Sequence, residues 1–297
     1  MSKEQHSNIE EYHLNRHQPG EDQFVIHDLK TYLNRNSNNT TRPHIHSYYQ
    51  IIWFKTGMGK HYVDFISHEV NDQMIFFIAK NQVHYFDKNI EYEGFLLHFN
   101  ETFLGQDDET DFFLKCNLFN NPYQQPYCRV DTSTISKLDI NIQQLKGELA
   151  ESNPFGRNEI IRAYLKSVLI LVQRSKNAYN IQQPDSFTAD DKRIQLVKFF
   201  NLVEEHYKEG LTINEYARKL NISTRTLSDL TNQQVNKTPS QMIQERIILE
   251  AQRLLVHSNL NINQIGFRMG FDDPSYFVKY FKKHTKMSPS DFRKTIA

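Results

Sequence analysis

Three histidines in the first third of the chain could supply imidazole ligands to a metal ion. His44 and His46 stand two residues apart, and His84 follows about forty residues later, after Lys80-Asn81-Gln82-Val83. Imidazole nitrogens suit divalent ions such as zinc, copper, iron and nickel. Gln50 stands four residues after His46, and its amide is a poor metal ligand. The spacing leaves two hypotheses open, a metal site and a pocket that histidines line.

The run Arg42-Pro43-His44-Ile45-His46, taken with His84, resembles the two-motif arrangement of cupin barrels. In metal-binding cupins the first motif supplies two histidines and then an acid, and the second motif supplies another histidine. Here Gln50 takes the acid's place, so we expect no metal, no other cofactor and no catalytic residue. We expect instead a small-molecule effector at the barrel mouth. The expected lining residues are Arg42, His44, His46, Tyr48, Gln50, His84 and Tyr85.

The segments around these histidines have the pattern of β-strands. Short aromatic and β-branched runs recur every ~8–15 residues, and Gly, Asn and Asp separate them. This spacing predicts an antiparallel sandwich or barrel, and we expect a small cupin-like β-barrel. The runs are 48–54, 61–65, 74–78 and 93–99. The donors and flat aromatic faces of the expected pocket suit a sugar, although they suit many other molecules equally.

Helical periodicity begins after the strands. Apolar residues repeat at intervals of three and four over 135–149 and again over 161–171, which predicts two amphipathic helices. They pack either on their own domain or against a second copy of the chain. Residues 176–189 lose this periodicity and are polar, so they are expected to form a linker. Helical pattern resumes at Leu196 and ends at Gly210.

Composition and charge narrow the classes of protein. The chain has 297 residues, enough for two domains, and its 38% hydrophobic content excludes a disordered protein. It lacks a long apolar run and an apolar signal peptide, so we expect a cytoplasmic protein with no membrane contact. Cys116 and Cys128 are too few for a disulfide framework. Residues 191–297 carry 17 Lys and Arg against 11 Asp and Glu, whereas 1–190 have a net charge of −6, which suggests a polyanion-binding C-terminal module.

The C-terminal third contains an internal repeat. Residues from Ile213 match those from Ile262 at an offset of 49, and after one inserted residue the offset becomes 50. Each copy holds a short apolar helix, a polar turn and a longer helix, which is a helix-turn-helix unit. Ser223 and Asp273 stand where the longer helices would be capped, and Thr238-Pro239 and Ser288-Pro289 predict two further helix starts.

The segment between the two units predicts a spacer. Pro239 to His257 has one apolar stripe, and a helix of this length is about 27 Å long. Successive major grooves on one face of DNA lie ~34 Å apart. Such a rod could therefore hold two recognition helices in consecutive grooves.

These residues resemble the AraC/XylS family of transcription regulators. The resemblance covers Leu211 to Arg293, and its most specific stretch runs from Ile265 to Phe277, followed by Phe281-Lys282-Lys283 and Ser288 to Arg293. The family often has Gly where this chain has Asn221, Asn236 and Lys286. The first copy also has Thr231-Asn232-Gln233 where an aromatic residue and two lysines are common, which weakens its expected grip on phosphate.

Helix geometry and the resemblance together indicate the DNA contacts. Arg225 is the expected base reader, because a guanidinium can bond guanine O6 and N7 together. Lys279 and Lys282 are expected to hold phosphate. The expected contact residues are Thr224, Arg225, Ser228, Asp229 and Asn232 in the first unit and Pro274, Ser275, Val278, Lys279 and Lys282 in the second.

We therefore expect a multi-domain protein of α and β structure and no enzyme. Its expected parts are a cupin-like sensing barrel (1–130), dimerising helices (131–175), the linker (176–189) and an all-α domain with two helix-turn-helix motifs (190–297). The resemblance implies a homodimer that binds promoter half-sites in duplex DNA, a small-molecule effector, and RNA polymerase as a partner. The alternative is a metal-dependent cupin enzyme with an appended helix-turn-helix domain.

Overall fold

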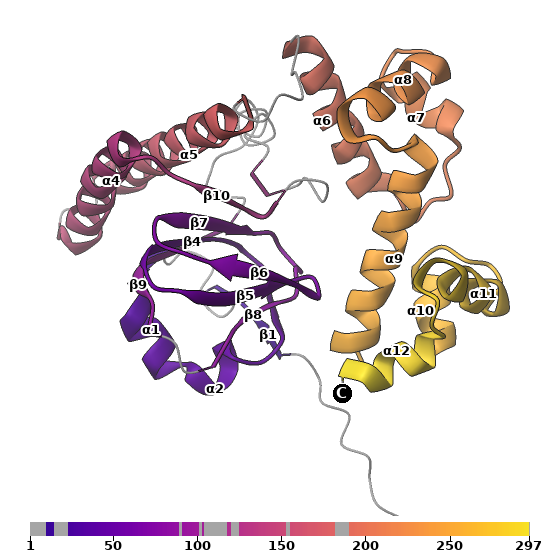
Figure 1. Cartoon of the computed structure of the whole chain (residues 1–297), viewed down its shortest axis with the longest axis horizontal. Helices are drawn as coiled ribbons and strands as arrows, with labels where there is room; N and C mark the ends of the chain where they lie inside the picture. Colours follow the sequence, from indigo (N-terminus) through magenta and orange to yellow (C-terminus); the bar gives the residue numbers. More distant parts are fainter. Residues whose placement is uncertain are drawn as a thin grey trace, which may run out of the picture. The chain divides into compact units, whose positions relative to one another are not determined.

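The chain forms two compact units. The computed structural model describes residues 10–14, 23–88, 91–100, 103, 118–119, 125–152, 155–181 and 190–296. One unit is Glu11–Ser186, and the other contains Phe187–Ala297. The first combines β-sheets with helices, whereas the described residues of the second form helices and their connections (Figure 1). This division into a β domain with helices and an all-helical domain confirms the predicted fold class.

Two five-stranded sheets form the framework of the first unit. In spatial order, the sheet that we call the β8 sheet contains β1 (Glu10–Tyr12), β3 (His44–His46), β8 (His84–Phe86), β5 (Gly59–Val63) and β6 (Ile66–Val70). The β4 sheet contains β10 (Tyr127–Arg129), β7 (Met74–Ile78), β4 (Tyr49–Thr56), β9 (Glu93–Phe99) and β2 (Phe24–Asp28). In the described residues no strand pairing joins the two sheets, so the closed barrel that we expected is not seen there.

The β4 sheet is buried on both faces. Side chains alternate across a strand, so neighbouring residues of β4 enter different cores. Ile52 and Phe54 pack between the two sheets, together with Val63 of the β8 sheet. Ile51 and Trp53 lie in the core on the opposite face. Two-sided burial explains why the middle of this strand, residues 51–54, is a continuous apolar run rather than an alternating one.

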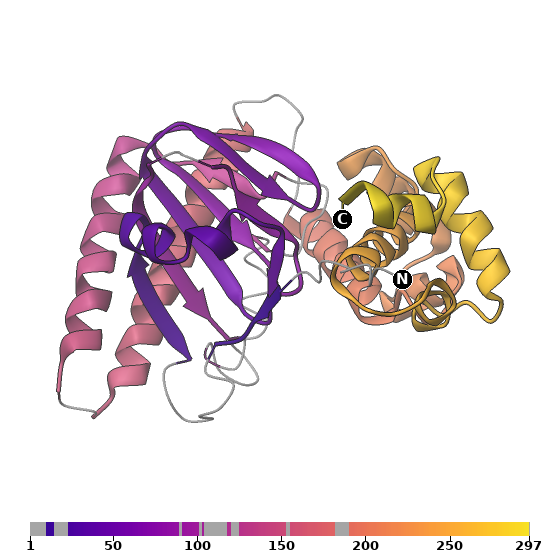
Figure 2. The ribbon, with the colours of Figure 1, turned by 90° about the horizontal axis from the view of Figure 1, so that it is seen from below.

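Two long helices cover the outer face of the β4 sheet. They are α4 (Thr132–Ala150) and α5 (Arg157–Ile181), which lie side by side along the sheet (Figure 2). Their predicted apolar stripes are buried against the sheet of the same chain, with Leu138, Ile142 and Val168 at most 3% exposed. Of the two hypotheses for these stripes, the structure therefore supports packing on their own domain. Helix α5 also includes residues 176–181 of the predicted linker, while 182–189 lie outside the described residues.

Two short helices and one thiol complete the described part of this unit. The helices α1 (Leu29–Arg35) and α2 (Ser37–Thr40) follow β2 directly, and Asp28 caps α1 by accepting a hydrogen bond from the backbone N–H of Thr31. Cys128 is a buried free thiol, and Cys116 lies outside the described residues. Within the described ranges of the whole chain, no helix has the length and apolar character needed to cross a membrane.

The second unit consists of two matching sets of helices after a leading one. The helices are α6 (Asp190–His206), α7 (Ile213–Lys219), α8 (Thr224–Val235), α9 (Pro239–His257), α10 (Ile262–Arg268), α11 (Pro274–Thr285) and α12 (Pro289–Ile296). Helices α7 and α10 begin 49 residues apart, and α8 and α11 begin 50 residues apart. The offsets are those of the sequence repeat, so both predicted helix-turn-helix units are confirmed.

The predicted helix starts are also confirmed. The side chains of Ser223 and Asp273 accept hydrogen bonds from the first turns of α8 and α11. Thr238 caps α9 with a reciprocal capping box, and Pro239 occupies its first turn. Ser288 accepts a hydrogen bond from the backbone N–H of Asp291 and so caps α12. Caps are visible in sequence because each satisfies donors within three residues of itself.

A buried ion-pair network joins α6 to α9. Arg246 Nε lies 2.6 Å from Glu204 Oε1, and an Arg246 guanidinium nitrogen lies 3.1 Å from Glu250 Oε2. Arg253 approaches the same Glu250 oxygen at 3.7 Å. Burial raises the pKa of Glu250, but Arg246 and Arg253 outweigh that effect, so the pKa lies below its usual value. Glu250 is therefore held as a carboxylate at the centre of this network.

Candidate nucleic-acid interface and buried histidine cluster

The predicted contact residues of the first helix-turn-helix unit lie on the solvent-exposed side of α8. Leu227 and Leu230 are buried in the domain core. Thr224, Arg225, Asp229 and Asn232 are exposed, and Ser228 is half-buried. The Arg225 side chain is 90% exposed, and its Nε lies 4.0 Å from Asp229 Oδ2. The expected base reader therefore extends into solvent with a carboxylate one turn away.

The second helix-turn-helix unit presents α11 in the same way. Phe277 and Phe281 are fully buried, and the predicted contacts Ser275, Lys279 and Lys282 are exposed. Pro274, Val278 and Tyr280 are half-buried. Sequence reasoning did not assign Tyr276 a role, yet this ring is 59% exposed on the outer side of α11. The signal for its exposure was its position directly before Phe277, because consecutive residues of a helix do not share a face and Phe277 is buried.

The two units share their turn geometry. Ile222 N–H donates to the Ala217 carbonyl, and Phe271 N–H donates to the Gly266 carbonyl, each at 3.0 Å. A Cβ at Gly266 would stand 3.2 Å from that of Phe277, so the missing side chain lets α10 and α11 pack closely. Equivalent hydrogen bonds at equivalent positions hold α8 and α11 against α7 and α10 in matching poses.

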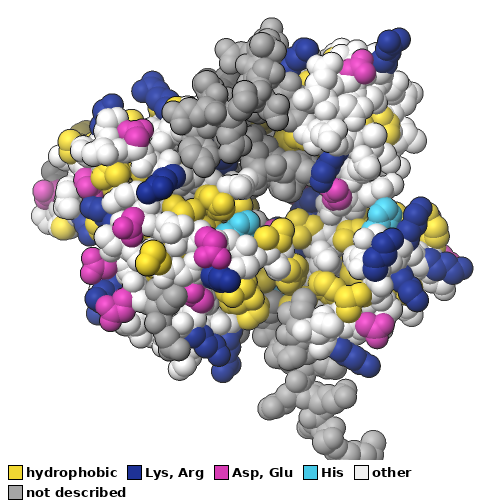
Figure 3. All heavy atoms as spheres, in the orientation of Figure 1, with side chains coloured by type: hydrophobic (Ala, Val, Ile, Leu, Met, Phe, Trp, Pro, Cys, Tyr) yellow, Lys and Arg dark blue, Asp and Glu magenta, His cyan; other side chains and the backbone are white. Residues whose placement is uncertain are grey.

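Cationic side chains are concentrated on the second helix-turn-helix unit. Lys282, Lys283 and His284 occupy the last turn of α11, and Lys286 follows directly. Figure 3 shows Lys and Arg side chains gathered over this helix. The corresponding residues of α8 include Asn232 and Gln233, which are exposed but neutral. The two recognition helices therefore differ in charge while they share a fold.

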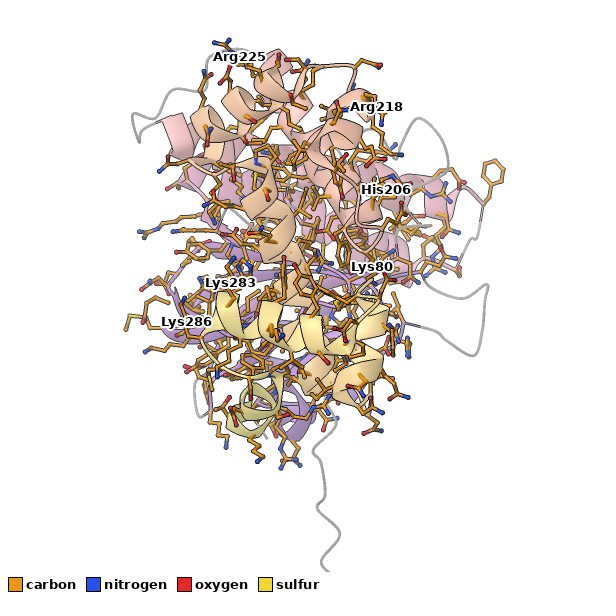
Figure 4. The ribbon with its side chains drawn as sticks, turned by 90° about the vertical axis from the view of Figure 1, so that its right-hand side faces the viewer. Lys80, His206, Arg218, Arg225, Lys283 and Lys286 are labelled. Atoms are coloured by element: carbon orange, nitrogen blue, oxygen red, sulfur yellow. The ribbon has the colours of Figure 1, made fainter. Side chains whose placement is uncertain are left out.

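Helix α9 separates the two recognition helices. Its 19 residues span about 28 Å at 1.5 Å per residue. It contacts α8 of the first helix-turn-helix unit, and it also packs against α10 and α11 of the second helix-turn-helix unit and against α12. Figure 4 shows Arg225 at the α8 end, and Lys283 and Lys286 at the α11 end, with α9 between them. The spacer has the length that the sequence predicts.

The three histidines of the N-terminal motifs meet on one face of the β8 sheet. His44 and His46 alternate along β3, so they share a face, and His84 on β8 stands directly opposite His44. One nitrogen from each ring lies within 4.8 Å of the others. All three side chains are buried, at 3%, 1% and 0% exposure. Strand pairing thus brings together residues some forty positions apart.

Further polar groups surround these three rings. Gln50 Nε2 lies 2.8 Å from His98 Nε2, so the amide in the expected acid's place contacts an imidazole instead. Tyr48 packs on His46 with ring centroids 4.5 Å apart, and Tyr12 of β1 lies 5.7 Å from both His44 and His46. The Nε2 of His61 lies 3.3 Å from His84 Nδ1. We call the five histidines 44, 46, 61, 84 and 98 the histidine cluster.

Two members of the histidine cluster were not predicted from the sequence. His61 and His98 lie inside predicted strands, but which face a side chain takes is uncertain when both faces of the strand are apolar. The available signal was that each stands two residues from Val63 or Leu96 on the same strand, and so shares the face that packs between the sheets. Conversely, Arg42 is exposed, and Tyr85 stacks on Tyr62 at 4.4 Å on the other face of β8. Tyr85 therefore lies away from the histidine cluster, because neighbouring strand residues point to opposite faces. Arg42 reaches the cluster only through its backbone carbonyl, which lies 2.8 Å from His44 Nδ1.

The electrostatics of the histidine cluster favour neutral rings. Burial lowers the pKa of His46, His61, His84 and His98 well below the usual value for histidine, and neighbouring histidines lower each pKa further. Burial also raises the pKa of the Tyr48 hydroxyl. At neutral pH these four rings therefore keep a lone pair for hydrogen bonding or for coordination.

Comparisons with known proteins agree with both halves of the chain. Residues 27–157 match the AraC-like ligand binding domain, and residues 216–295 match a helix-turn-helix domain. The transcriptional activator RhaR of Escherichia coli (strain K12) is 27% identical over 175 residues, which are 59% of this chain and 60% of RhaR. The chain thus aligns with less than two thirds of that relative's length.

Other matches extend over different shares of the chain. The transcriptional activator RhaS of Escherichia coli O81 (strain ED1a) is 22% identical over 290 residues, which cover 91% of this chain and 96% of RhaS. A solved AraC-type regulator from Chromobacterium violaceum covers 37% of this chain and 97% of its own, with 26% identity and a TM-score of 0.34. RhaR and RhaS are transcriptional activators rather than enzymes, in agreement with the expectation of no enzyme. The chain belongs to the AraC family of transcriptional regulators, with an AraC-like ligand-binding domain followed by a helix-turn-helix domain.

Proposed function

We propose that this chain controls transcription in the cytoplasm by binding promoter DNA through α8 and α11, under the control of a small molecule in its N-terminal domain. The observation that carries this proposal is the repeat of two equally posed helix-turn-helix units, joined by a spacer of about 28 Å. A spacer of that length suits two consecutive major grooves, which lie ~34 Å apart.

The two recognition helices would divide the work on DNA. Arg225 stands exposed on α8, where its guanidinium could bond a guanine edge bidentately. Lys279 and Lys282 on α11 would bond phosphates and so position the protein without reading sequence. Thr224, Ser228, Asp229 and Asn232 would border the base edges around Arg225. Pro274, Ser275 and Val278 would do the same at the start of α11.

A homodimer would place two such domains on paired half-sites, next to RNA polymerase. The inner stripes of α4 and α5 pack on their own sheet, so the dimer contact must use other residues. Ile140 is 62% exposed and Ile160 is 41% exposed on these helices, and both are apolar. Exposed apolar side chains of this size are typical of association surfaces when they gather in a patch. We propose the outward side of α4 and α5 as that surface.

The effector would bind at the histidine cluster. His44, His46, Tyr48, Gln50 and His84 from the predicted pocket lie together there, joined by His61 and His98. Buried polar atoms normally have partners, and Gln50 Oε1 has none among the described residues. A hydroxyl-rich molecule such as a sugar would supply such partners. Its binding would shift the population between two arrangements of the dimer, which requires different affinities for each.

Selection from a random duplex pool tests the proposed function. The full chain is incubated with the pool at two salt concentrations, and the retained DNA is sequenced. We expect a shared half-site and an affinity that falls steeply with salt. Arg225→Ala should relax the selected sequence, while Lys137→Ala, which removes an exposed cation from α4, should leave it unchanged. Retention of no shared sequence by the wild-type chain would refute the assignment.

A further inference from the structure

Three imidazole nitrogens converge in a buried space without a carboxylate among their described contacts. We propose that His44, His46 and His84 bind one divalent transition-metal ion of the zinc class through three imidazole nitrogens. The sequence alone favoured a pocket without metal, because Gln50 stands where an acid was expected. The structure changes the balance, since three ligands suffice for a tetrahedral ion that keeps its fourth position for water or an effector oxygen.

The placement of the three rings is the first argument. The three nitrogens lie within 4.8 Å of one another, and all three side chains are buried. A tetrahedral zinc ion with bonds of about 2.1 Å holds its nitrogens about 3.4 Å apart. The rings therefore need to move inward by only about an ångström. Directly opposed residues of paired strands, as His44 and His84 are, hold their side chains on a rigid frame.

Unpartnered nitrogens are the second argument. Both ring nitrogens of His46 and the Nε2 of His84 are buried and have no hydrogen-bond partner among the described residues. A buried polar atom normally has a partner, and an orphaned one points to a missing ligand, ion or water. That two of the three candidate ligands carry such atoms, on one face of one sheet, favours a shared bound species over separate packing defects.

The surrounding hydrogen bonds are the third argument. His44 Nδ1 lies 2.8 Å from the Arg42 carbonyl oxygen, so Nδ1 donates its proton and the lone pair is on Nε2. His84 Nδ1 lies 3.3 Å from His61 Nε2, which leaves His84 Nε2 for the ion. Metal-binding histidines commonly donate their second ring N–H in this way, which fixes the ring and its tautomer. His61 would thus be a positioning residue for His84.

The chemistry of the ligand set selects the class of ion. Three neutral imidazoles suit zinc, copper, nickel or iron, whereas calcium and magnesium require oxygen ligands. The pair of Gln50 with His98 would lie beside the ion without supplying a carboxylate. The inference deepens the proposed effector site, but it concerns metal binding and does not depend on DNA recognition.

Metal titration of the untagged full chain tests this inference. The protein is treated with a chelator, and Co²⁺ is then added as a spectroscopic substitute for zinc. We expect one equivalent to bind, with the intense visible bands of a tetrahedral cobalt centre, and Zn²⁺ to displace it. X-ray absorption of the zinc-loaded wild-type chain should show three imidazole ligands. Fewer than two imidazoles, or no saturable binding, would overturn the proposal whatever the variants do.

Matched variants assign the site. His46→Gln and His84→Gln should each abolish the tetrahedral spectrum, and His61→Gln should weaken affinity by about tenfold while the spectrum persists. His68→Gln is the control, because this half-buried histidine of β6 packs against Phe76 and Tyr127, outside the three ligands. Unchanged binding in folded His46→Gln and His84→Gln would place the metal elsewhere. Loss of DNA binding alone would contradict the proposed function and leave this inference intact.

Discussion

Asn236 and Lys286 occupy equivalent left-handed positions, with φ of 52° and 64°, directly after the two recognition helices. In both, the backbone N–H of this residue donates to a carbonyl one turn back, so the chain leaves α8 and α11 in the same direction. The relationship accounts for the resemblance to a family with glycine at these places. Asparagine tolerates a positive φ, while lysine pays a steric penalty there.

The Lys286→Gly variant should therefore be more stable than the wild type. Relief of the left-handed penalty of ~1–2 kcal/mol exceeds the greater entropy of glycine in the unfolded chain, so we expect a gain of roughly 0.5–1 kcal/mol. Asn236→Gly should change the free energy of unfolding by only about a few tenths of a kcal/mol, because asparagine already tolerates a positive φ. Urea denaturation followed by circular dichroism measures both variants. A less stable Lys286→Gly chain would mean that the lysine side chain contributes contacts that outweigh the backbone penalty.

Gly270 should not tolerate a side chain. Its φ is +84°, and a Cβ built there would stand 1.9 Å from the carbonyl oxygen of Lys208. Overpacking and backbone strain together predict that Gly270→Ala destabilises the second unit by about 2–4 kcal/mol. Gly147→Ala is the control, because that helical glycine has no neighbour within 4 Å of a new Cβ. Thermal denaturation should show a large loss for the first and a gain of about 0.5–1 kcal/mol for the second.

Removing the charge of Glu250 should destabilise the link between α6 and α9. Glu250→Gln leaves Arg246 and Arg253 short of a buried partner, for an expected loss of about 2–3 kcal/mol. Glu245→Gln, which breaks a more exposed pair with Lys237, should cost under about 1 kcal/mol. Equal losses in denaturation midpoint for the two variants would contradict the central role of Glu250.

The same network predicts a pH dependence. The pKa of Glu250 lies below its unfolded value of 4.5, so the unfolded chain binds this proton more readily. Its contribution is therefore fully present above about pH 4.5 and is lost as the pH falls through the folded pKa. The free energies of unfolding of Glu250→Gln and of the wild type, measured between pH 7 and pH 3, should approach each other as the pH falls. A difference that stays constant over this range would exclude the carboxylate as its source.

The outward side of α4 should control association. Ile140→Glu places a charge on a side chain that is 62% exposed, so it should weaken the proposed dimer without unfolding the monomer. Sedimentation at several concentrations measures the dimer fraction, with Lys219→Ala, at an exposed position of α7, as the control. A dimer constant that Ile140→Glu leaves unchanged would place the interface elsewhere.

Local signals in the sequence were sufficient for the helical domain but not for the sheets. Ser223, Asp273 and Thr238 announce helix starts through hydrogen bonds within three residues, and the repeat exposes its own register. The faces of Leu227 and Phe277 follow from helical periodicity alone. These features depend on neighbours in the chain, so sequence reasoning reaches them.

The histidine cluster depends on pairing between distant strands. The predicted trio of His44, His46 and His84 meets because β3 pairs with β8, and a motif could indicate that. Tyr85 lies apart from this trio because it is the next residue after His84 on the same strand and so points to the opposite face. His98 joins through the register of β9 against β4, which places it opposite Gln50. Register of this kind is a tertiary property that the local pattern of an apolar strand does not encode.

The most direct test of the account is a map of guanine N7 protection on the selected duplex with the full chain bound. Two recognition helices on one spacer predict two protected major-groove clusters on one face of each half-site, centred about one helical turn, ~10 base pairs, apart. Arg225→Ala should remove protection from one cluster and keep the other. A single protected cluster for each half-site in the wild type would contradict the claim that both helix-turn-helix units engage DNA.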